Sequence, residues 1–385
     1  MKITTELKKY IDALRSRSLL VSFDGDMNET ISNVTHDSRE VTRGTLFICK
    51  GAGFKPEYLY SAVEKGAVAY ISETDYRIPA SAVIVSDVRA AMAAAAKVFF
   101  DNAPSKLRTV GITGTKGKST TAYYMKSVLD EFNGGKTAIL SSIDNFDGVI
   151  SEESHLTTPE SLMLLNHCSN AVDSGLSHLV MEVSSQGLKL GRVCEMNYDV
   201  AAFLNIGADH ISPIEHADFE DYFSSKLKIF DYCKAACVNL DCEHSDRILS
   251  EARKRNIGIL TFGTDEKCDI YGFDIRANNG GINFSVRDGG SVLPYRINMT
   301  GLFNGSNALC VIAMSKILGI PYRCVSAGLA KATVPGRMEV FESRDGKCTV
   351  IVDYAHNKMS FKALYESTKI EYPGKKIITV FGCPG

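Results

Sequence analysis

Residues 108–121 read Arg108-Thr109-Val110-Gly111-Ile112-Thr113-Gly114-Thr115-Lys116-Gly117-Lys118-Ser119-Thr120-Thr121, an extended apolar lead-in followed by a glycine-rich turn and a helix start. The glycines let the backbone curl close to an anion, and a helix that begins near Lys118 directs unpaired N–H groups toward it. Lys118 adds an ammonium group and Ser119 a hydroxyl that can ligate Mg²⁺. The stretch predicts a phosphate-binding loop for ATP and Mg²⁺, whose nucleotide contacts are Gly114, Thr115, Lys116, Gly117, Lys118, Ser119 and Thr120.

The loop departs from the strict nucleotide-binding pattern, which has its first glycine where this chain has Ile112; Gly111 lies one place too early. The context supports the interpretation, because apolar residues recur at helical spacing after the loop, at Ala122, Met125, Leu129 and Phe132. The alternative is an ordinary strand-to-helix turn. Such a turn has no use for a lysine and three hydroxyl side chains at the helix start, so we favour the phosphate loop.

The composition is that of a globular protein long enough for two or three domains, with 385 residues of which 45% are hydrophobic. The 43 Lys and Arg nearly balance 45 Asp and Glu, so no net charge attracts nucleic acid or an anionic membrane. Charges interrupt residues 1–20, which argues against a signal peptide, and no apolar run reaches the ~20 residues that span a bilayer. We expect a cytoplasmic protein.

Residues 1–105 predict a small α/β domain. Short apolar runs indicate strands at 46–49, 67–71 and 82–85, and helical patterns cover 58–65 and 90–100. Residues 101–105, Asp-Asn-Ala-Pro-Ser, are typical of a turn-forming linker, so the phosphate loop opens a second domain.

Continuous apolar runs after the loop predict a doubly wound parallel sheet in residues 106–335. The runs at 179–183, 199–206 and 236–240 are typical of strands covered on both faces. Alternating apolar and polar residues at 282–287 and 295–299 instead indicate a small antiparallel sheet. In such a fold, ligands gather at the carboxyl ends of the parallel strands.

Two side chains at those carboxyl ends are candidate metal ligands. Glu182 closes one strand, and His210 follows the next. At the same sheet edge as a phosphate loop, a carboxylate and an imidazole can ligate Mg²⁺ or order water on it. The alternative, a capping or turn role, is ordinary for either residue alone; together with the loop we favour the metal site, more firmly for Glu182.

Lys226 lies on the apolar face of a predicted helix at 219–230. Phe219, Tyr222, Phe223 and Phe230 share one face with it, whereas Lys228 points elsewhere. A lysine on a buried stripe is paired, depressed in pKa or chemically used. Periodicity alone leaves a second possibility open, that the side chain snorkels to solvent.

Residues 336–385 begin a third domain. A strand at 349–352, a helix and a further strand at 376–381 are expected before Gly382-Cys383-Pro384-Gly385. So few residues do not make a self-sufficient α/β domain. We expect the sequence to be a fragment of a longer protein, or its third domain to be incomplete.

These motifs together resemble the Mur ligase family of ATP-dependent amide-forming enzymes, and within it the branch that adds the third amino acid of the peptidoglycan stem peptide. The motifs occur in family order over essentially the whole chain: Asp37-Ser38-Arg39, Gly111 to Thr121, Leu156-Thr157-Thr158-Pro159-Glu160, Met181-Glu182-Val183-Ser184-Ser185, Asn205 with Asp209-His210, Lys226, Gly301 to Asn307, Gly336-Arg337-Met338-Glu339 and Asp353-Tyr354-Ala355-His356. The resemblance implies a three-domain architecture, with a UDP-sugar-binding domain at 1–105, an ATP-binding domain at 106–335 and an incomplete, Rossmann-like amino-acid-binding domain from 336.

The resemblance also implies roles for single residues. Ser38 would hold the uridine nucleotide, and Thr157, Thr158, Ser184 and Arg192 the muramoyl-dipeptide. Asn304 and Arg337 would contact ATP, and Asp353 its ribose. Ser119, Glu182, His210 and Lys226 would serve the metals, Lys226 as the family's carbamylated lysine. Lys118, Glu182, His210 and Lys226 are the catalytic candidates.

The implied reaction adds an amino acid to UDP-N-acetylmuramoyl-L-alanyl-D-glutamate through an acyl phosphate, in a monomeric enzyme. The segments 210–216 and 382–385 look more like the lysine-adding branch than the diaminopimelate-adding one. Lys116 replaces the commoner asparagine, and Leu190 stands where some members have a substrate-binding glutamine. Three alternatives stay open: another amino acid, a folate polyglutamate or cyanophycin-type ligase, and a Mur-like ATP-binding protein without ligase activity.

Overall fold

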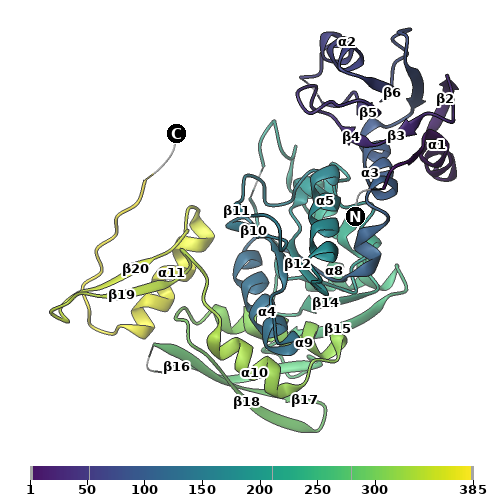
Figure 1. Ribbon diagram of the computed structural model, residues 1–385. Helices are drawn as coiled ribbons and strands as arrows, with labels where there is room; N and C mark the ends of the chain where they lie inside the picture. The colour runs from purple at the N-terminus through teal and green to yellow at the C-terminus, as the bar shows by residue number, and fades with distance from the viewer. Residues whose placement is uncertain (1–2, 52, 210, 279, 383–385) are drawn as a thin grey trace.

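The computed structural model describes residues 3–51, 53–209, 211–278 and 280–382. Figure 1 shows the chain as three successive parts: an N-terminal part, a large middle part that carries the long sheet, and a C-terminal part on its other side. The expected domain boundaries near residues 105 and 335 stay predictions. No helix within the described ranges is both long and apolar enough to cross a membrane.

The N-terminal part contains, among its described residues, a five-stranded sheet in the order β2-β7-β6-β5-β4. Its strands are β2 (Leu20–Asp24), β4 (Asn33–Thr35), β5 (Thr45–Ile48), β6 (Ala67–Ser72) and β7 (Ser81–Val85), and β1 (Thr5–Glu6) pairs with β3 (Thr30–Ile31). Its helices are α1 (Leu7–Ser16), α2 (Pro56–Glu64) and α3 (Val88–Phe99), and a 3₁₀ turn follows at Ala103–Lys106. The expected strands and helices are therefore confirmed to within a few residues.

The middle part is built on a sheet whose described strands number 11, in the order β11-β10-β9-β12-β8-β13-β14-β15-β16-β17-β18. The six from β9 to β15 pair in parallel. Their bounds are β8 (Arg108–Thr113), β9 (Ala138–Leu140), β12 (His178–Glu182), β13 (Val200–Phe203), β14 (Ala235–Asn239) and β15 (Gly258–Gly263), and the edge hairpin is β10 (Asp144–Phe146) with β11 (Ser151–Glu153). The prediction of a central parallel sheet is confirmed.

Helices cover both faces of this sheet, because both sides of its central strands are apolar. On β13, Ala202 belongs to the core beneath α4 and α9, and Phe203 belongs to the core shared with α5, α7 and α8. The helices are α4 (Lys118–Asn133), α5 (Ser161–Asp173), α6 (Ser185–Lys189), α7 (Phe219–Leu227) with a 3₁₀ turn at Lys228–Tyr232, α8 (Ser245–Arg253), α9 (Asn304–Leu318) and α10 (Tyr322–Lys331). The sheet is thus doubly wound. In such a sheet a ligand site is expected at the carboxyl ends of the parallel strands.

The expected antiparallel strands are present as β16 (Ile270–Asn278), β17 (Gly281–Asp288) and β18 (Ser291–Ile297). They continue the large sheet instead of forming one of their own, because β16 pairs in parallel with the end of β15. Figure 1 shows them as a long ribbon beside α10.

The C-terminal part consists of β19 (Glu339–Glu342), β20 (Thr349–Val352) and α11 (Lys358–Glu371). The prediction of a strand at 376–381 is wrong: these residues lie outside every strand of the described ranges. A strand requires a neighbour for its backbone hydrogen bonds, and β19 and β20 pair only with each other among the described residues. The apolar pattern alone could not supply that partner.

Candidate active site

The phosphate-loop stretch forms the turn between β8 and α4. Gly117 stands immediately before α4 with φ +87°, in the left-handed region. A Cβ there would also lie 2.4 Å from Asn307 Oδ1. A side chain at position 117 would therefore be both strained and blocked, which explains the glycine at the start of the helix.

Lys118 bends back over the loop that precedes it. Its Nζ donates to the carbonyl oxygens of Gly114 at 3.0 Å and Thr115 at 3.3 Å. Burial lowers the pKa of Lys118, and nearby Glu182 opposes that shift. The ammonium is therefore held at the turn that is expected to bind a phosphate.

Lys226 reaches the same carbonyl oxygen from α7, and its Nζ donates to Gly114 O at 3.0 Å. The side chain is 1% exposed, so the snorkelling alternative is wrong, whereas exposed Lys228 points away as expected. Its Nζ also lies 4.8 Å from the ring centroid of Tyr222, whose hydroxyl is 3.0 Å from Thr115 Oγ1. Burial, and then the nearby Lys118, hold the pKa of Lys226 well below its usual value.

Glu182 ends β12 directly beside β8, in register with Ile112, and is 1% exposed. Its Oε1 accepts hydrogen bonds from the backbone N–H of Ser142 at 2.8 Å and from Ser142 Oγ at 3.2 Å. Ser142 Oγ lies 3.0 Å from Ser119 Oγ. The structure thus links the carboxylate to the first turn of α4 through one serine.

A cavity of about 200 Å³ unites these groups. Its lining residues are Thr115, Lys116, Gly117, Lys118, Ser119, Thr120, Ser142, Thr157, Glu182, Arg337, Tyr354 and His356. Two lysines and an arginine face one carboxylate, a charge balance that suits a polyanion accompanied by a divalent cation. Among the described residues, no cluster of three or more His, Cys, Asp or Glu side chains is placed to hold a metal alone.

The C-terminal part contributes one wall of this cavity. Arg337 Nη2 donates to Ser119 Oγ at 3.3 Å, and its guanidinium lies 4.6 Å from the ring centroid of Tyr354. Lys116 Nζ lies 3.2 Å from Asp209 Oδ2 and 3.3 Å from His356 Nε2. The loop therefore contacts a segment more than two hundred residues later in the chain.

Two of the residues expected to contact ATP are set back from this cavity. Asn304 donates to Thr300 O at 2.8 Å and accepts from Asn307 Nδ2 at 3.0 Å, so its link to the loop runs through Asn307. Asp353 Oδ2 accepts from the backbone N–H of Met338 at 3.0 Å, and burial raises its pKa. Their contacts with ATP stay predictions.

Three of the four residues expected to bind the dipeptide are joined by hydrogen bonds, and one of them, Thr158, contacts the backbone of Glu182. Thr158 Oγ1 donates to Glu182 O at 3.1 Å and accepts from Ser184 N at 2.9 Å. Arg192 Nη1 donates to Thr158 O at 3.1 Å. The fourth, Thr157, lines the cavity itself. The structure therefore places this group directly beside the phosphate loop.

The remaining expected residues lie elsewhere. Ser38 belongs to the N-terminal part, in a turn where Arg39 and Asp37 form an ion pair at 2.6 Å, and its carbonyl oxygen accepts from Lys65 Nζ at 2.8 Å. Ser38 does not line the cavity at the phosphate loop. His210 lies outside the described residues, so its metal role stays a prediction.

Sequence reasoning missed Ser142 and the partners of Glu160. Ser142 follows β9, so the carboxyl-end rule that selected Glu182 could have found it. Glu160 was noted only as part of a motif, yet it forms ion pairs with Lys50, Arg89 and Arg192. No local pattern indicates those partners, because two of them belong to the N-terminal part.

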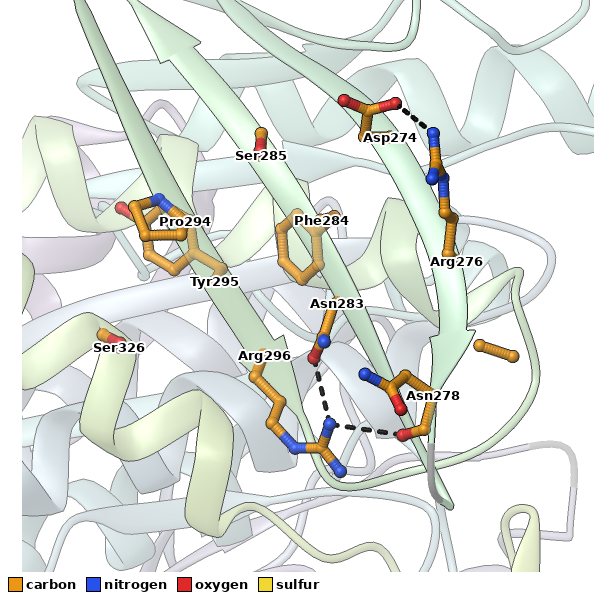
Figure 2. A pocket seen from close by; sticks show the side chains of 11 residues that line it. Asp274, Arg276, Asn278, Asn283, Phe284, Ser285, Pro294, Tyr295, Arg296 and Ser326 are labelled. Carbon is orange, nitrogen blue, oxygen red and sulfur yellow. Dashed lines mark hydrogen bonds and ion pairs between the residues drawn. The ribbon is translucent and has the colours of Figure 1, made fainter.

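A wider hollow lies on β16–β18 and α10, with a volume of about 600 Å³ (Figure 2). Its two arginines already have partners: Arg276 pairs with Asp274 at 2.9 Å, and Arg296 donates to Asn283 Oδ1 at 3.0 Å. None of its lining residues belongs to the loop cavity. We therefore place the candidate active site at the phosphate loop.

Comparison with known families finds matches over the middle part and the C-terminal part. Residues 112–315 match the Mur ligase middle domain, and residues 336–385 match the Mur ligase glutamate ligase domain. The chain is 40% identical to the UDP-N-acetylmuramyl-tripeptide synthetase of Lactococcus lactis subsp. cremoris over 94% of this chain and 73% of that protein. It is 38% identical to the UDP-N-acetylmuramoyl-L-alanyl-D-glutamate–L-lysine ligase of Enterococcus faecalis, over 92% and 71%.

Solved structures share the fold. A UDP-N-acetylmuramoyl-L-alanyl-D-glutamate–2,6-diaminopimelate ligase superimposes with a TM-score of 0.82 at 24% identity, covering 100% of this chain and 77% of that one. MurF from Acinetobacter baumannii superimposes with a TM-score of 0.70 at 20% identity, covering 95% and 76%. At such identities the likeness concerns the fold alone.

Proposed function

The chain belongs to the Mur ligase family, and on that premise we propose that it is an ATP-dependent ligase that adds L-lysine to UDP-N-acetylmuramoyl-L-alanyl-D-glutamate. The observation that carries the proposal is the convergence of Lys118, Ser119 and Glu182 on one cavity that Thr157 also lines. A phosphate-binding group and a carboxylate-binding group are thus neighbours, as transfer of a phosphoryl group to a carboxylate requires.

In this proposal, ATP is bound by the phosphate loop and the first turn of α4. Lys118 and the N–H groups of the first turn offset phosphate charge, and Arg337 adds a guanidinium from the C-terminal part. Glu182 and the hydroxyl of Ser119 fit Mg²⁺, which commonly takes one or two carboxylates and completes its shell with phosphate oxygens and water. The bound ion would neutralise charge on the transferred phosphoryl group.

The reaction proceeds in two displacements. An oxygen of the terminal D-glutamate carboxylate attacks the γ-phosphorus of ATP, the bond to the bridging oxygen breaks, and ADP leaves. The amino group of lysine then attacks the carbonyl carbon of the acyl phosphate, releases inorganic phosphate and loses a proton to leave the amide. Lys118 and Arg337 stabilise the negative charge in the first displacement.

Lys226 is proposed to carry a carbamate, as the family resemblance implies. Its lowered pKa favours the neutral amine, whose lone pair can attack CO₂, and loss of an N–H proton then leaves a carbamate. The negative charge of the carbamate would be attracted to the neighbouring Lys118 ammonium, whereas a protonated Lys226 would be repelled by it. The new carboxylate would lie beside the phosphate loop, where it could help to orient Mg²⁺.

The substrate assignment follows the relatives and the polar group beside Glu182. Thr157, Thr158, Ser184 and Arg192 offer hydroxyls and a guanidinium to the peptide carboxylates. Lysine is favoured over diaminopimelate because the Enterococcus faecalis relative is named for lysine at 38% identity, whereas the diaminopimelate ligase shares the fold at 24%. ATP and a nucleotide-linked substrate favour a cytoplasmic location, and the monomeric state stays a prediction.

Replacement of the loop lysine tests this function. In Lys118→Met the ammonium is lost while the length of the side chain is nearly kept, so we expect substrate-dependent ADP release to fall about 10²–10³-fold. The measurement is a coupled assay of the full-length protein with ATP, Mg²⁺, the UDP-linked dipeptide and L-lysine, with diaminopimelate and ornithine in parallel.

The matched control is Lys126→Met on the same helix. Lys126 pairs with Asp130 at 2.6 Å and does not line the cavity. We expect its ADP release to stay close to that of the wild type. If no amino acid supports ADP release in the wild type, or if the two variants behave alike, the ligase assignment fails.

A further inference from the structure

The segment that follows β13 runs alongside the phosphate loop. In the parallel pair of β13 with β8, Phe203 is opposite Thr113, and the N–H of Leu204 donates to Thr113 O at 2.9 Å. Further along, the N–H of Thr115 donates to Asn205 O at 3.1 Å. Backbone pairing therefore continues beyond the ends of both strands and into the loop.

The side chain of Asn205 binds both backbone polar groups of one loop residue. Its Oδ1 accepts from the N–H of Lys116 at 2.9 Å, and its Nδ2 donates to Lys116 O at 3.0 Å. A carboxamide offers an acceptor and donors, as a peptide bond offers one of each, so it can pair with a peptide in this way. An aspartate would lack the donor, and an aliphatic side chain would lack both groups.

The loop is also packed closely against this segment. A Cβ on Gly114 would lie 2.9 Å from Leu204 Cβ and 3.3 Å from the backbone nitrogen of Asn205. The N–H of Gly207 donates to Thr115 Oγ1 at 3.1 Å. Residues 114–116, which begin the turn, are therefore held along residues 204–207.

Asn205 is half-buried and does not line the cavity at the phosphate loop, so its side chain can act on a bound anion only through the loop. Asn205 already accepts from the N–H groups of Thr115 and Lys116. The N–H groups left for a phosphate are those of Gly117 and the first turn of α4, which have no acceptor within the helix. Their direction depends on how the preceding peptide is held.

We propose that Asn205 is a positioning residue that holds the phosphate loop in its anion-binding conformation. The proposal rests on the proposed function, because it concerns the ATP site of that function. A glycine-rich loop loses much conformational freedom when it becomes ordered, and a loop that is already ordered avoids this loss on binding. Without the two side-chain hydrogen bonds the binding conformation would be less populated, and the apparent affinity for phosphate would fall in proportion.

The test compares a nucleotide with the nucleoside that lacks its phosphates. Isothermal titration of the full-length protein with ADP and Mg²⁺, and with adenosine by displacement, gives the affinity due to the phosphates. Asn205→Leu nearly keeps the size of the side chain and removes both hydrogen bonds. We expect it to bind ADP about tenfold more weakly and adenosine as the wild type does.

Asn298→Leu is the matched control. Asn298 also joins two segments, because its Nδ2 donates to Ala330 O at 2.6 Å and its Oδ1 accepts from Arg296 Nε at 2.7 Å. It does not line the cavity at the phosphate loop. We expect Asn298→Leu to leave the ratio of ADP to adenosine affinity unchanged.

Two results in Asn205→Leu would overturn the proposal alone. Equal weakening of ADP and adenosine would mean a general structural role, and an unchanged preference for ADP would mean that the loop is held without this side chain. A wild type without any preference for ADP would overturn the proposed ATP site as well. If thermal unfolding shows that Asn205→Leu is not folded, Asn205→Ser replaces it with the same expected ratio, because the shorter hydroxyl cannot bind both groups of Lys116.

Discussion

Two lysines meet at one backbone oxygen in the candidate site. Lys118 and Lys226 each donate to Gly114 O at 3.0 Å, one from α4 and the other from α7. Two ammonium groups this close repel each other, and burial adds to the cost of charging Lys226. The arrangement is favourable once one of the two is neutral or negatively charged. This is the physical basis for proposing a carbamate on Lys226.

Lys226→Ala should therefore lower the ligation rate by more than the loss of one hydrogen bond would. We expect ligation to fall about 10²–10³-fold, as when a preorganised charge at a phosphoryl-transfer site is removed. Acetate in the assay should restore part of the rate, because it can supply a carboxylate in the space left by the side chain. The measurement is the steady-state rate at increasing acetate concentration.

Lys228→Ala provides the control for that variant. Lys228 is exposed and follows α7 directly, so its loss should change neither the rate nor its response to acetate. A Lys226→Ala enzyme with the wild-type rate would reject the carbamate. A slow enzyme that acetate does not improve would reduce Lys226 to a structural role.

Helical periodicity correctly placed Lys226 on the apolar face of its helix, but it left open whether the side chain reaches solvent, and only the structure shows that the side chain is buried. The same reasoning could not predict that Gly114 accepts from it, since that contact joins residues 112 positions apart. Glu182 was found from its place at a strand end, and Ser142 at the neighbouring strand end was overlooked. The ion pairs of Glu160 depend on how two parts of the chain pack, which no local pattern records.

At the scale of elements, α10 and α4 approach each other closely at a glycine. A Cβ on Gly328 would lie 2.4 Å from the Cα of Val128, and Ser127 Oγ donates to Gly328 O at 2.8 Å. The two helices are therefore in backbone contact behind the phosphate loop. Any side chain at position 328 would push α10 away from the helix that carries Lys118.

Gly328→Ala tests that packing. Alanine is about 1 kcal/mol better than glycine inside a helix, but overpacking costs about 1–3 kcal/mol, and backbone atoms cannot rotate away from the clash. We expect a net loss of stability, seen as a melting midpoint about 2–5 °C lower in thermal unfolding.

The control for this variant is Gly258→Ala in β15. A Cβ there would meet only Ala235 Cβ, at an ordinary 3.6 Å. Its melting midpoint should stay close to that of the wild type. If Gly328→Ala melts at or above the wild-type temperature, the helices have room that the structure does not show.

Strands could be predicted from the sequence where both of their faces are buried. The apolar runs that predicted β12, β13 and β14 describe strands with helices on both faces, so the pattern needs no knowledge of neighbours. Residues 376–381 show the same apolar character, yet Val380 is 94% exposed. A strand is a property of a pair of segments, and composition cannot supply the second one.

At the scale of the whole molecule, the cavity is shared by distant parts of the chain. Arg337 reaches Ser119, and Asn357 Nδ2 donates to Asp209 Oδ2 at 3.0 Å while Lys116 contacts the same carboxylate at 3.2 Å. Such closure shields an acyl phosphate from water, which would otherwise hydrolyse it. The proposed reaction therefore requires that an acyl phosphate is formed.

Oxygen-isotope transfer tests that central claim most directly. The full-length protein is given ATP, Mg²⁺, L-lysine and the UDP-linked dipeptide labelled with ¹⁸O in the terminal carboxylate of D-glutamate. Because a carboxylate oxygen attacks phosphorus and then leaves with it, we predict that each inorganic phosphate released with a lysine-containing product carries one ¹⁸O by mass spectrometry. Unlabelled phosphate, or phosphate released without an amide product, would contradict the account.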